Sequence, residues 1–296
     1  MRVVVTGSSG FIGCNVVAAL ARDGHYVIGI SREANSPHAA ENHLCEIESI
    51  EAREAAATGE YIVHLAALSD ASLSMSQPLL YNRVNAGGTL NMLEAARQSR
   101  SGFILASTQR IYRPQPEPLK EELTAGPVDP YGYSKVVAEK WVEMYGRFYG
   151  LRTTVARLFS VYGVGQRPGK GLSGVVALFV AKALAGEHMV VDSRTRRDFT
   201  YVADVVRGLR SIIEAPDPAG KTYNIATGIG YSLAELASQV REACGSPSGI
   251  VHIGDCGEGQ NYIADLSRAT EDLGYRPTID LRQGLRLYVD WMRTPG

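Results

Sequence analysis

The sequence predicts an α/β protein with a parallel, doubly wound sheet and a smaller lobe toward the C-terminus. Two observations predict this fold. Short apolar runs alternate with segments of helical period through the first half, and a glycine-rich turn joins the first run to the first helical segment. Such alternation is typical of parallel strands with helices on both faces, so we expect a sheet of about seven strands.

The predicted elements follow one another in a regular order. Runs of β-branched and other apolar residues predict strands at Arg2–Thr6, Tyr26–Ile30, Tyr61–Ala66, Gly102–Ser107 and Thr153–Leu158. Amphipathic segments between them predict helices at Phe11–Arg22, Ala86–Gln98 and Lys135–Tyr149. The later elements are a helix at Ala203–Glu214, a strand at Tyr223–Ala226, and helices at Ser232–Cys244 and Leu281–Met292.

These elements divide the chain into two parts. We expect residues 1–165 and about 198–226 to form the sheet domain, and about 166–197 with 227–296 to form the lobe. A ligand is expected in the cleft between the two, at the carboxyl ends of the strands.

Bulk composition excludes several classes of protein. A net charge of −1 argues against nucleic acid as a main partner, since phosphate-binding surfaces carry a basic excess. The longest apolar stretch, Val175–Ala181, is far shorter than the roughly 20 residues that span a membrane, and the N-terminus is typical of a strand rather than of a signal peptide. No cysteine or histidine spacing is typical of a metal site, so we expect free thiols, no metal and a cytoplasmic location.

The turn after the first predicted strand has the spacing of a phosphate-binding loop. Gly7 permits the tight turn, Gly10 lets the backbone approach a pyrophosphate, and Gly13 lets the helix pack closely on the strand. The N-terminus of the following helix offers free N–H groups to the phosphates. We therefore predict dinucleotide binding, through Gly7, Ser9, Gly10, Phe11, Ile12 and Gly13.

The end of the second predicted strand normally decides which dinucleotide binds. Here Ser31 and Arg32 follow Ile30; both can bind a 2′-phosphate, and no carboxylate stands at the strand end to repel one. The sequence therefore favours NADP over NAD. The alternatives are that Arg32 is a solvated loop residue, or that it stacks on adenine while NAD is bound. Glu46, after what could be a third strand, is a candidate for binding the adenine amino group.

A tyrosine and a lysine four residues apart follow a helix start signal. Asp129 is a candidate N-cap and Pro130 stands at the first helical position, so Tyr131 and Lys135 share one helix face. Tyrosine ordinarily has a pKa of about 10, and a nearby ammonium group favours the phenolate and lowers this pKa. Tyr133 is too close to Lys135 in sequence to share that face. Tyr131 is thus the predicted acid–base residue.

The order of these motifs resembles that of the extended short-chain dehydrogenase/reductase family, which includes nucleotide-sugar epimerases, dehydratases and reductases. The matching segments are TGSSGFIG from Thr6, HLAA from His64, Asn85 before GGT, STQRIY from Ser107, PYGYSK from Pro130, RLFSVYG from Arg157, RDFTYVAD from Arg197, YNIATG from Tyr223, ADL from Ala264 and LGYRP from Leu273. These ordered matches cover nearly the whole chain. The resemblance implies a Rossmann-type fold with a C-terminal substrate-binding lobe, and an NAD(P)-dependent nucleotide-sugar epimerase or ketoreductase.

The resemblance also implies roles for individual residues. Thr108 would hold the reacting oxygen, Tyr131 would exchange the alcohol proton during hydride transfer, and Lys135 would also bind the nicotinamide ribose. Further cofactor contacts are implied for Leu65, Ala66, Ala67 and Asn85. His64, beside them, is more typical of a buried strand-end histidine than of a catalytic residue.

The substrate region matches the family only in part. Arg197 is implied to pair with a nucleotide diphosphate, but Ser160 replaces a usual asparagine and His252 replaces a second phosphate-binding arginine. We therefore expect a nucleotide-linked sugar, with an unactivated sugar or sugar acid as the alternative. Dehydratases of the family carry Asp-Glu after the catalytic threonine; Gln109 and Arg110 stand there, so dehydration is not expected. Epimerisation and net reduction or oxidation both remain open.

Two expectations concern the protein as a whole. A non-catalytic dinucleotide-sensing relative is the alternative to an enzyme, but such proteins typically lose the tyrosine or the lysine, and this chain keeps Thr108, Tyr131 and Lys135. The helices at 86–98 and 135–149 are expected to pair across a two-fold axis in a homodimer, because the second carries more apolar residues than one sheet face needs.

Overall fold

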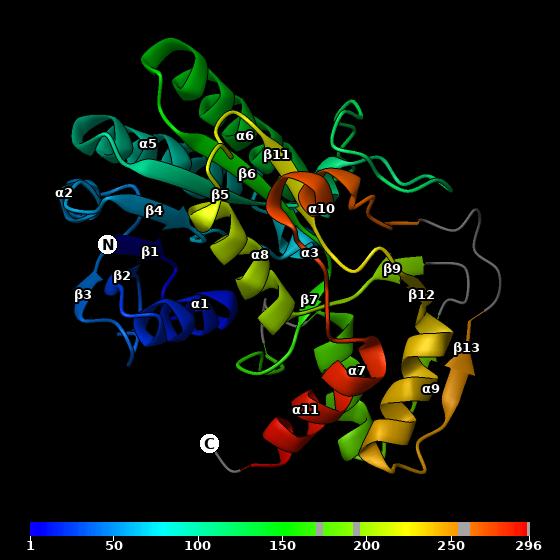
Figure 1. Ribbon diagram of the computed structural model, residues 1–296. Helices are drawn as coiled ribbons and strands as arrows, with labels where there is room; N and C mark the ends of the chain where they lie inside the picture. Colours follow the sequence, from blue (N-terminus) through cyan, green and yellow to red (C-terminus); the bar gives the residue numbers. More distant parts are fainter. Residues whose placement is uncertain (170–173, 192–195, 254–260, 295–296) are drawn as a thin grey trace.

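The computed structural model describes residues 1–169, 174–191, 196–253 and 261–294 (Figure 1). A seven-stranded parallel sheet lies at its centre, in the order β11-β6-β5-β4-β1-β2-β3. The strands are β1 (Arg2–Thr6), β2 (Tyr26–Ser31), β3 (Glu41–Leu44), β4 (Tyr61–His64), β5 (Gly102–Thr108), β6 (Thr153–Leu158) and β11 (Thr222–Ile225). The predicted doubly wound parallel sheet is confirmed.

Helices cover both faces of the sheet. One face carries α1 (Phe11–Arg22), α8 (Val202–Glu214) and α10 (Ser267–Leu273), and the other carries α2 (Ile50–Ala56), α5 (Gly88–Ser99) and α6 (Pro130–Tyr149). Strand side chains alternate between the two cores: Val3 and Val5 of β1 pack on the α1 side and Val4 packs on the α5 side. This period of two follows from strand geometry, and burial on both faces explains why the strands are continuously apolar.

The strand order reverses between β1 and β4. From β1 the chain moves outward through β2 and β3, then returns to pair β4 with β1 on its other side, with Thr6 opposite His64 in the register. Open α/β sheets bind ligands outside the carboxyl ends of the strands at such a reversal. The topology therefore places a candidate site beside the ends of β1 and β4.

A smaller apolar cluster lies beyond the sheet, at the lower right of Figure 1. Its helices are α7 (Val175–Leu184), α9 (Leu233–Cys244) and α11 (Leu281–Arg293). Its short strands pair as β8 (Met189–Val191) with β13 (Ile250–His252), β9 (Arg196–Asp198) with β12 (Gly230–Ser232), and β7 (Val161–Tyr162) with β10 (Thr200–Tyr201). The division into two domains stays a prediction; within the range assigned to the lobe, α10 packs against α8 and β11 of the large sheet.

Several helix boundaries differ from the predicted ones. The helix predicted from Ala86 is preceded by α3 (Ala71–Ser74), by α4 (Pro78–Tyr81) and by a π-helical turn at Asn82–Gly87. The helix predicted from Lys135 begins at Pro130, and Asp129 is its N-cap, with Oδ1 accepting from the Gly132 N–H at 2.7 Å. The acidic cap and the proline at the first position thus start α6 as the sequence predicted.

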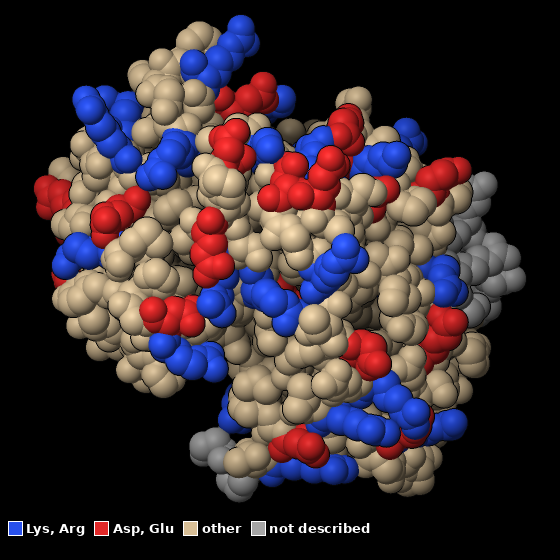
Figure 2. Space-filling view, viewed as in Figure 1, with Lys and Arg blue, Asp and Glu red and all other residues tan. Residues whose placement is uncertain are grey.

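Surface charge, helix length and possible metal ligands can each be compared with the expectations drawn from composition. Lysine and arginine side chains are interspersed with aspartate and glutamate over the face shown in Figure 2. None of the described helices is long and apolar enough to cross a membrane. Within the described ranges, no group of three or more histidine, cysteine, aspartate or glutamate residues could hold a metal ion.

Candidate active site

The glycine loop between β1 and α1 has the shape that a pyrophosphate requires. Gly7 has φ +67°, in the region that favours glycine, and a Cβ on it would lie 3.0 Å from the backbone N of Ala66. A Cβ on Gly13 would collide with the carbonyl of Gly7. Gly10 is the N-cap of α1 and supplies no side chain to cap it, so the first N–H groups of this helix are available to phosphate oxygens. The residues present therefore fit a dinucleotide.

His64 holds the end of β4 in place rather than facing a substrate. The Thr6 hydroxyl accepts from the backbone N–H groups of the two residues after His64, at 3.1 Å each, and lies 2.8 Å from His64 Nδ1. The Thr89 hydroxyl donates to the Asn85 carbonyl, so it accepts from His64 Nε2 at 3.1 Å. Burial lowers the pKa of His64 to about 3, and its imidazole is neutral.

Asn85, predicted as a cofactor residue, lies fully buried behind the same loop. Its Oδ1 accepts from the Leu68 N–H at 2.8 Å, and its Nδ2 donates to the Leu68 carbonyl at 3.0 Å and to Ser134 Oγ at 2.9 Å. The amide therefore ties the loop after β4 to α6. Leu65, Ala66 and Ala67 precede this tie, and Leu65 and Ala66 lie next to Gly7 of the glycine loop.

The residues predicted to select the dinucleotide have partners within the chain. Ser31 donates its hydroxyl to the Ala34 carbonyl, and Arg32 forms an ion pair with Glu33. The Glu33 side chain is the first cause of the raised pKa of Arg32, and Glu46 and Glu48 add to it. The Glu33 carboxylate thus binds the guanidinium that the sequence assigned to a 2′-phosphate.

Thr108 and Tyr131 come together at the carboxyl end of β5, and Lys135 follows one turn further along α6. Thr108 ends this strand, and its side chain hydrogen-bonds with the Tyr131 phenol. Tyr131 stands in the first turn of α6, where its backbone N–H donates to Ser74 Oγ at 3.2 Å and its ring packs edge-on against Tyr81. Tyr131 and Lys135 are both buried, on one face of the helix.

Burial drives both titratable groups toward their neutral forms. It raises the pKa of Tyr131 to about 12, opposed by Thr108 and by the positive charge of Arg110. It lowers the pKa of Lys135 to about 8, opposed by Glu139 one turn further along α6. The sequence predicted that Lys135 lowers the pKa of Tyr131; in the structure Thr108 and Arg110 are the main groups that do so.

A buried ion pair lies behind Lys135. Arg157 of β6 donates to Glu139 through Nη2 at 2.7 Å and Nε at 3.1 Å, and the Ser107 hydroxyl donates to the same carboxylate at 2.5 Å. Arg157 also donates to the Tyr112 hydroxyl at 2.8 Å. Sequence reasoning missed Glu139, although its position four residues after Lys135 is the signal that could have found it.

Two polar side chains that sequence reasoning did not assign to binding lie near the Thr108 turn. Gln109 Nε2 donates to the Ser160 hydroxyl at 3.1 Å, which brings the predicted Ser160 into this region. Gln109 Oε1 and the Tyr262 hydroxyl are buried, with no hydrogen-bond partner in the part of the chain that the structure describes. Burial raises the pKa of Tyr262, and the charges of Arg110 and Arg197 oppose this effect. Tyr262 forms a backbone bridge with Arg197 of β9.

Arg197 stands on β9, opposite Tyr231 of β12, and next to a buried aspartate. Asp198 accepts from the backbone N–H groups of Thr227 at 2.9 Å and Gly228 at 2.7 Å, although burial raises its pKa to about 6. These bonds fix the strand that carries Arg197. His252 is exposed at the end of β13.

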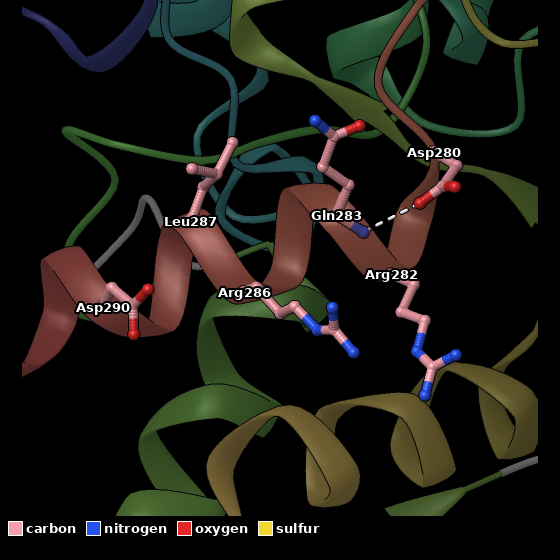
Figure 3. A pocket seen from close by; sticks show the side chains of 6 residues that line it. All are labelled: Asp280, Arg282, Gln283, Arg286, Leu287 and Asp290. Atoms are coloured by element: carbon pink, nitrogen blue, oxygen red, sulfur yellow. Dashed lines mark hydrogen bonds between the residues drawn. The ribbon is translucent and has the colours of Figure 1, made fainter.

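A surface groove along α11 is separate from this site. It is lined by Asp280, Arg282, Gln283, Arg286, Leu287 and Asp290, which all project from one helix (Figure 3). Arg282 pairs with Glu242 of α9, and Asp280 caps α11. None of the predicted site residues lines this groove, so we do not assign the chemistry to it.

The sheet reversal, the glycine loop and the Thr108–Tyr131–Lys135 group define a dinucleotide-binding protein of the short-chain dehydrogenase type. The model of the NAD dependent epimerase/dehydratase family matches residues 3–226, and the chain belongs to this family.

Known proteins resemble the chain over its whole length. A UDP-glucose 4-epimerase of Mycolicibacterium smegmatis is 34% identical, with 99% of each chain covered. The crystal structure of a UDP-glucose 4-epimerase with UDP-glucose from Thermotoga maritima has a TM-score of 0.91 and 32% identity, with 99% of both chains covered. MoeE5 in complex with UDP-glucuronic acid and NAD has the same TM-score and 28% identity, again over 99% of both chains.

Replacing Lys135 with methionine should raise the free energy of unfolding, because it removes a buried ammonium group at similar volume. The folded pKa of about 8 lies below the usual 10.5, so the unfolded chain binds more protons in this window and wild-type stability rises with pH across it. The gain from Lys135→Met should therefore be on the order of 2 kcal/mol at pH 7 and shrink by pH 10. Urea unfolding at both pH values measures it.

Lys140→Met is the matched control, since the Lys140 side chain is 72% exposed on the same helix. It should change stability little at either pH. Equal stability of the wild type and Lys135→Met at pH 7 would contradict the picture of a disfavoured buried ammonium.

Proposed function

We propose that the protein is a nucleotide-sugar epimerase that inverts a sugar ring carbon through a transient ketone. The observation that carries this proposal is the buried group of Thr108, Tyr131 and Lys135 at the carboxyl edge of the sheet, together with a glycine loop that fits a dinucleotide. Relatives named UDP-glucose 4-epimerase match over the whole chain, which supports UDP-glucose as the first substrate to test.

The chain's own residues divide the chemistry between them. A bound nicotinamide dinucleotide supplies the hydride acceptor and donor. Thr108 holds the reacting hydroxyl, and Tyr131 takes the hydroxyl proton as the carbon is oxidised and returns it as the ketone is reduced. Lys135 holds the ribose of the dinucleotide from the next turn of α6. Burial of all three side chains excludes water, which protects the ketone from release and side reactions.

The residues after Thr108 support epimerisation over dehydration. Gln109 and Arg110 cannot supply the carboxylate pair that dehydration needs, whereas Gln109 Oε1 can accept from a substrate hydroxyl. A net ketoreductase is the second candidate. An epimerase interconverts UDP-glucose and its epimer without net change in the dinucleotide, whereas a ketoreductase consumes one equivalent of dinucleotide for each product.

The substrate is proposed to lie between the sheet and the lobe. Arg197 would bind the diphosphate, while Ser160 and Gln109 would line the sugar site. The pKa of Tyr262 is raised by burial and lowered by both Arg110 and Arg197, which supports this path for the substrate. His252 lies exposed on β13, so no substrate contact is proposed for it.

Tyr131→Phe should leave folding and dinucleotide affinity intact, because it keeps the ring that packs against Tyr81 and removes only the hydroxyl. Turnover of UDP-glucose should fall by about 100-fold or more, in the range typical of positioned acid–base groups. Coupled detection of the epimer measures it.

Tyr133→Phe is the control, because Tyr133 is 60% exposed and carries no role in the site. It should be nearly silent. Full turnover by Tyr131→Phe would assign the chemistry to other residues and leave a shared fold without the shared mechanism.

We propose that NAD binds more tightly than NADP, although the sequence favours NADP. Arg32 is paired with Glu33, and Glu46 adds negative charge near the guanidinium that a 2′-phosphate would have to reach. A phosphate there would meet like charges before it reached the guanidinium. NAD bound to MoeE5 supports the same choice.

Glu33→Gln tests this choice, because it frees Arg32 and removes one negative charge. NADP affinity should rise by roughly fivefold to tenfold, while NAD affinity changes little. Titration of both dinucleotides into the wild type and the variant measures the ratio of the two affinities. Glu60→Gln serves as control, because Glu60 accepts from the Arg2 N–H at the start of β1, at the opposite end of the strand from the glycine loop. Tighter binding of NADP by the wild type would restore the prediction made from Ser31 and Arg32.

We propose a homodimer through α5 and α6. Tyr133, Val137 and Phe148 are exposed on α6, and Leu79, before α5, is 86% exposed. Trp141 and Met144 pack against the sheet core instead, so the available face is smaller than the sequence suggested.

Light scattering at micromolar concentration should give twice the chain mass, and Val137→Glu should give the monomer. A monomeric wild type would remove the proposal.

A further inference from the structure

Arg110 stands at one of the two positions where dehydratases of the family carry Asp-Glu, and the proposed mechanism gives it no role. It lies in the 3₁₀ turn Gln109–Ile111 directly after Thr108, and its Nη1 donates to Asp129 Oδ2 at 2.9 Å. The other oxygen of Asp129 caps α6 by accepting from the Gly132 N–H at 2.7 Å. One carboxylate therefore binds both the guanidinium and the first turn of the helix that carries Tyr131.

The backbone of Arg110 is held at the same place. Its N–H donates to Thr108 Oγ1 at 3.2 Å, and its carbonyl packs against Gly132, where an added Cβ would lie 2.5 Å from that oxygen. A residue with a side chain at position 132 would push the two segments apart. The turn after β5 and the start of α6 are thus in direct contact, with Arg110 between them.

Charged and titratable groups face the Tyr131 phenol from each element packed around it. Thr108 at the end of β5 hydrogen-bonds with the phenol, and Arg110 in the following turn lowers the pKa of Tyr131 by its positive charge. Asp129 at the start of α6 and Tyr81 of α4 raise that pKa. Arg110 is thus the cation with the clearest effect on the phenol.

Lys135, on the next turn of α6, faces other groups. Burial lowers the pKa of Lys135 and Glu139, one turn further along the helix, opposes this effect, while the charge of Lys135 itself adds to the lowered pKa of His64 on β4. Its ammonium is therefore balanced by Glu139, and Glu139 is itself bound by Arg157.

We propose that Arg110 is a positioning residue for the acid–base tyrosine. Its ion pair with Asp129 holds the Thr108 turn against α6, and its guanidinium places a positive charge beside the ionised form of Tyr131. This inference rests on the proposed role of Tyr131. Asp129 has two opposed effects: it positions the guanidinium of Arg110, and its own negative charge offsets the effect of that guanidinium on the phenol.

Two substitutions break the same ion pair but change the charge in opposite senses. Arg110→Gln removes the cation, so the acid limb of the pH profile of kcat/KM for UDP-glucose should move up by about one pH unit. Asp129→Asn keeps an N-cap oxygen and leaves the guanidinium, so the limb should move down. If the ion pair only holds the two segments together and has no electrostatic effect, both variants should lose rate and the acid limb should move in neither.

A second measurement does not depend on turnover. The phenolate absorbance of Tyr131, obtained as the difference from Tyr131→Phe at each pH, should titrate highest in Arg110→Gln, next in the wild type and lowest in Asp129→Asn. Arg110→Lys keeps the charge and should have the wild-type midpoint. If Arg110→Gln does not fold, Arg110→Lys is compared with Asp129→Asn instead, and its midpoint should be the higher of the two.

The control is the ion pair of Arg210 and Asp23, which has a separation of 2.8 Å and lies at the amino edge of the sheet. Arg210→Gln and Asp23→Asn should move neither readout. Equal midpoints in the two Arg110–Asp129 variants, or shifts in the same direction, overturn the inference. Full turnover by Tyr131→Phe overturns the proposed function instead, and the absorbance order still tests Arg110.

Discussion

The contact between the first turn of α6 and the carboxyl end of β5 is the constraint on which the site depends. Thr108 leaves the sheet there, and Tyr131 can reach it only because Gly132 lets the Arg110 carbonyl approach the helix. Asn85 holds α6 from its other side through Ser134. Once this first turn is fixed, helical geometry alone places the lysine side chain one turn further on the same face.

Burial sets the electrostatic character of this contact. It raises the pKa of Tyr131 to about 12 and lowers that of Lys135 to about 8, so an ionised pair is less favourable here than in water. The polar neighbours oppose the effect: Arg110 acts on the phenol and Glu139 acts on the ammonium. A buried site can therefore still ionise here only because these neighbours are charged.

Local patterns predicted the parts of the fold that local physics determines. The β-branched run of β1 and the Asp129–Pro130 start of α6 are both local signals, and the structure has the predicted strand and the predicted helix start. The π-helical turn at Asn82–Gly87 was not predicted, because the turn carries buried residues such as Asn85 whose partners lie on other elements. The same holds for Tyr262, whose neighbours Arg110 and Arg197 are distant in the chain. Glu139 could have been found from its spacing to Lys135.

Arg32 and Arg110 differ in how readily a ligand can displace their carboxylate partners. The Arg32 and Glu33 side chains are 54% and 73% exposed, and such a surface pair is worth at most about 1 kcal/mol and is screened by salt. Asp129 is only 8% exposed and also caps α6, so releasing Arg110 would leave a buried carboxylate without its cation. Arg32 is therefore open to competition between Glu33 and a phosphate, which local sequence cannot decide, whereas Arg110 is a fixed part of the site whose charge acts on whatever the tyrosine binds.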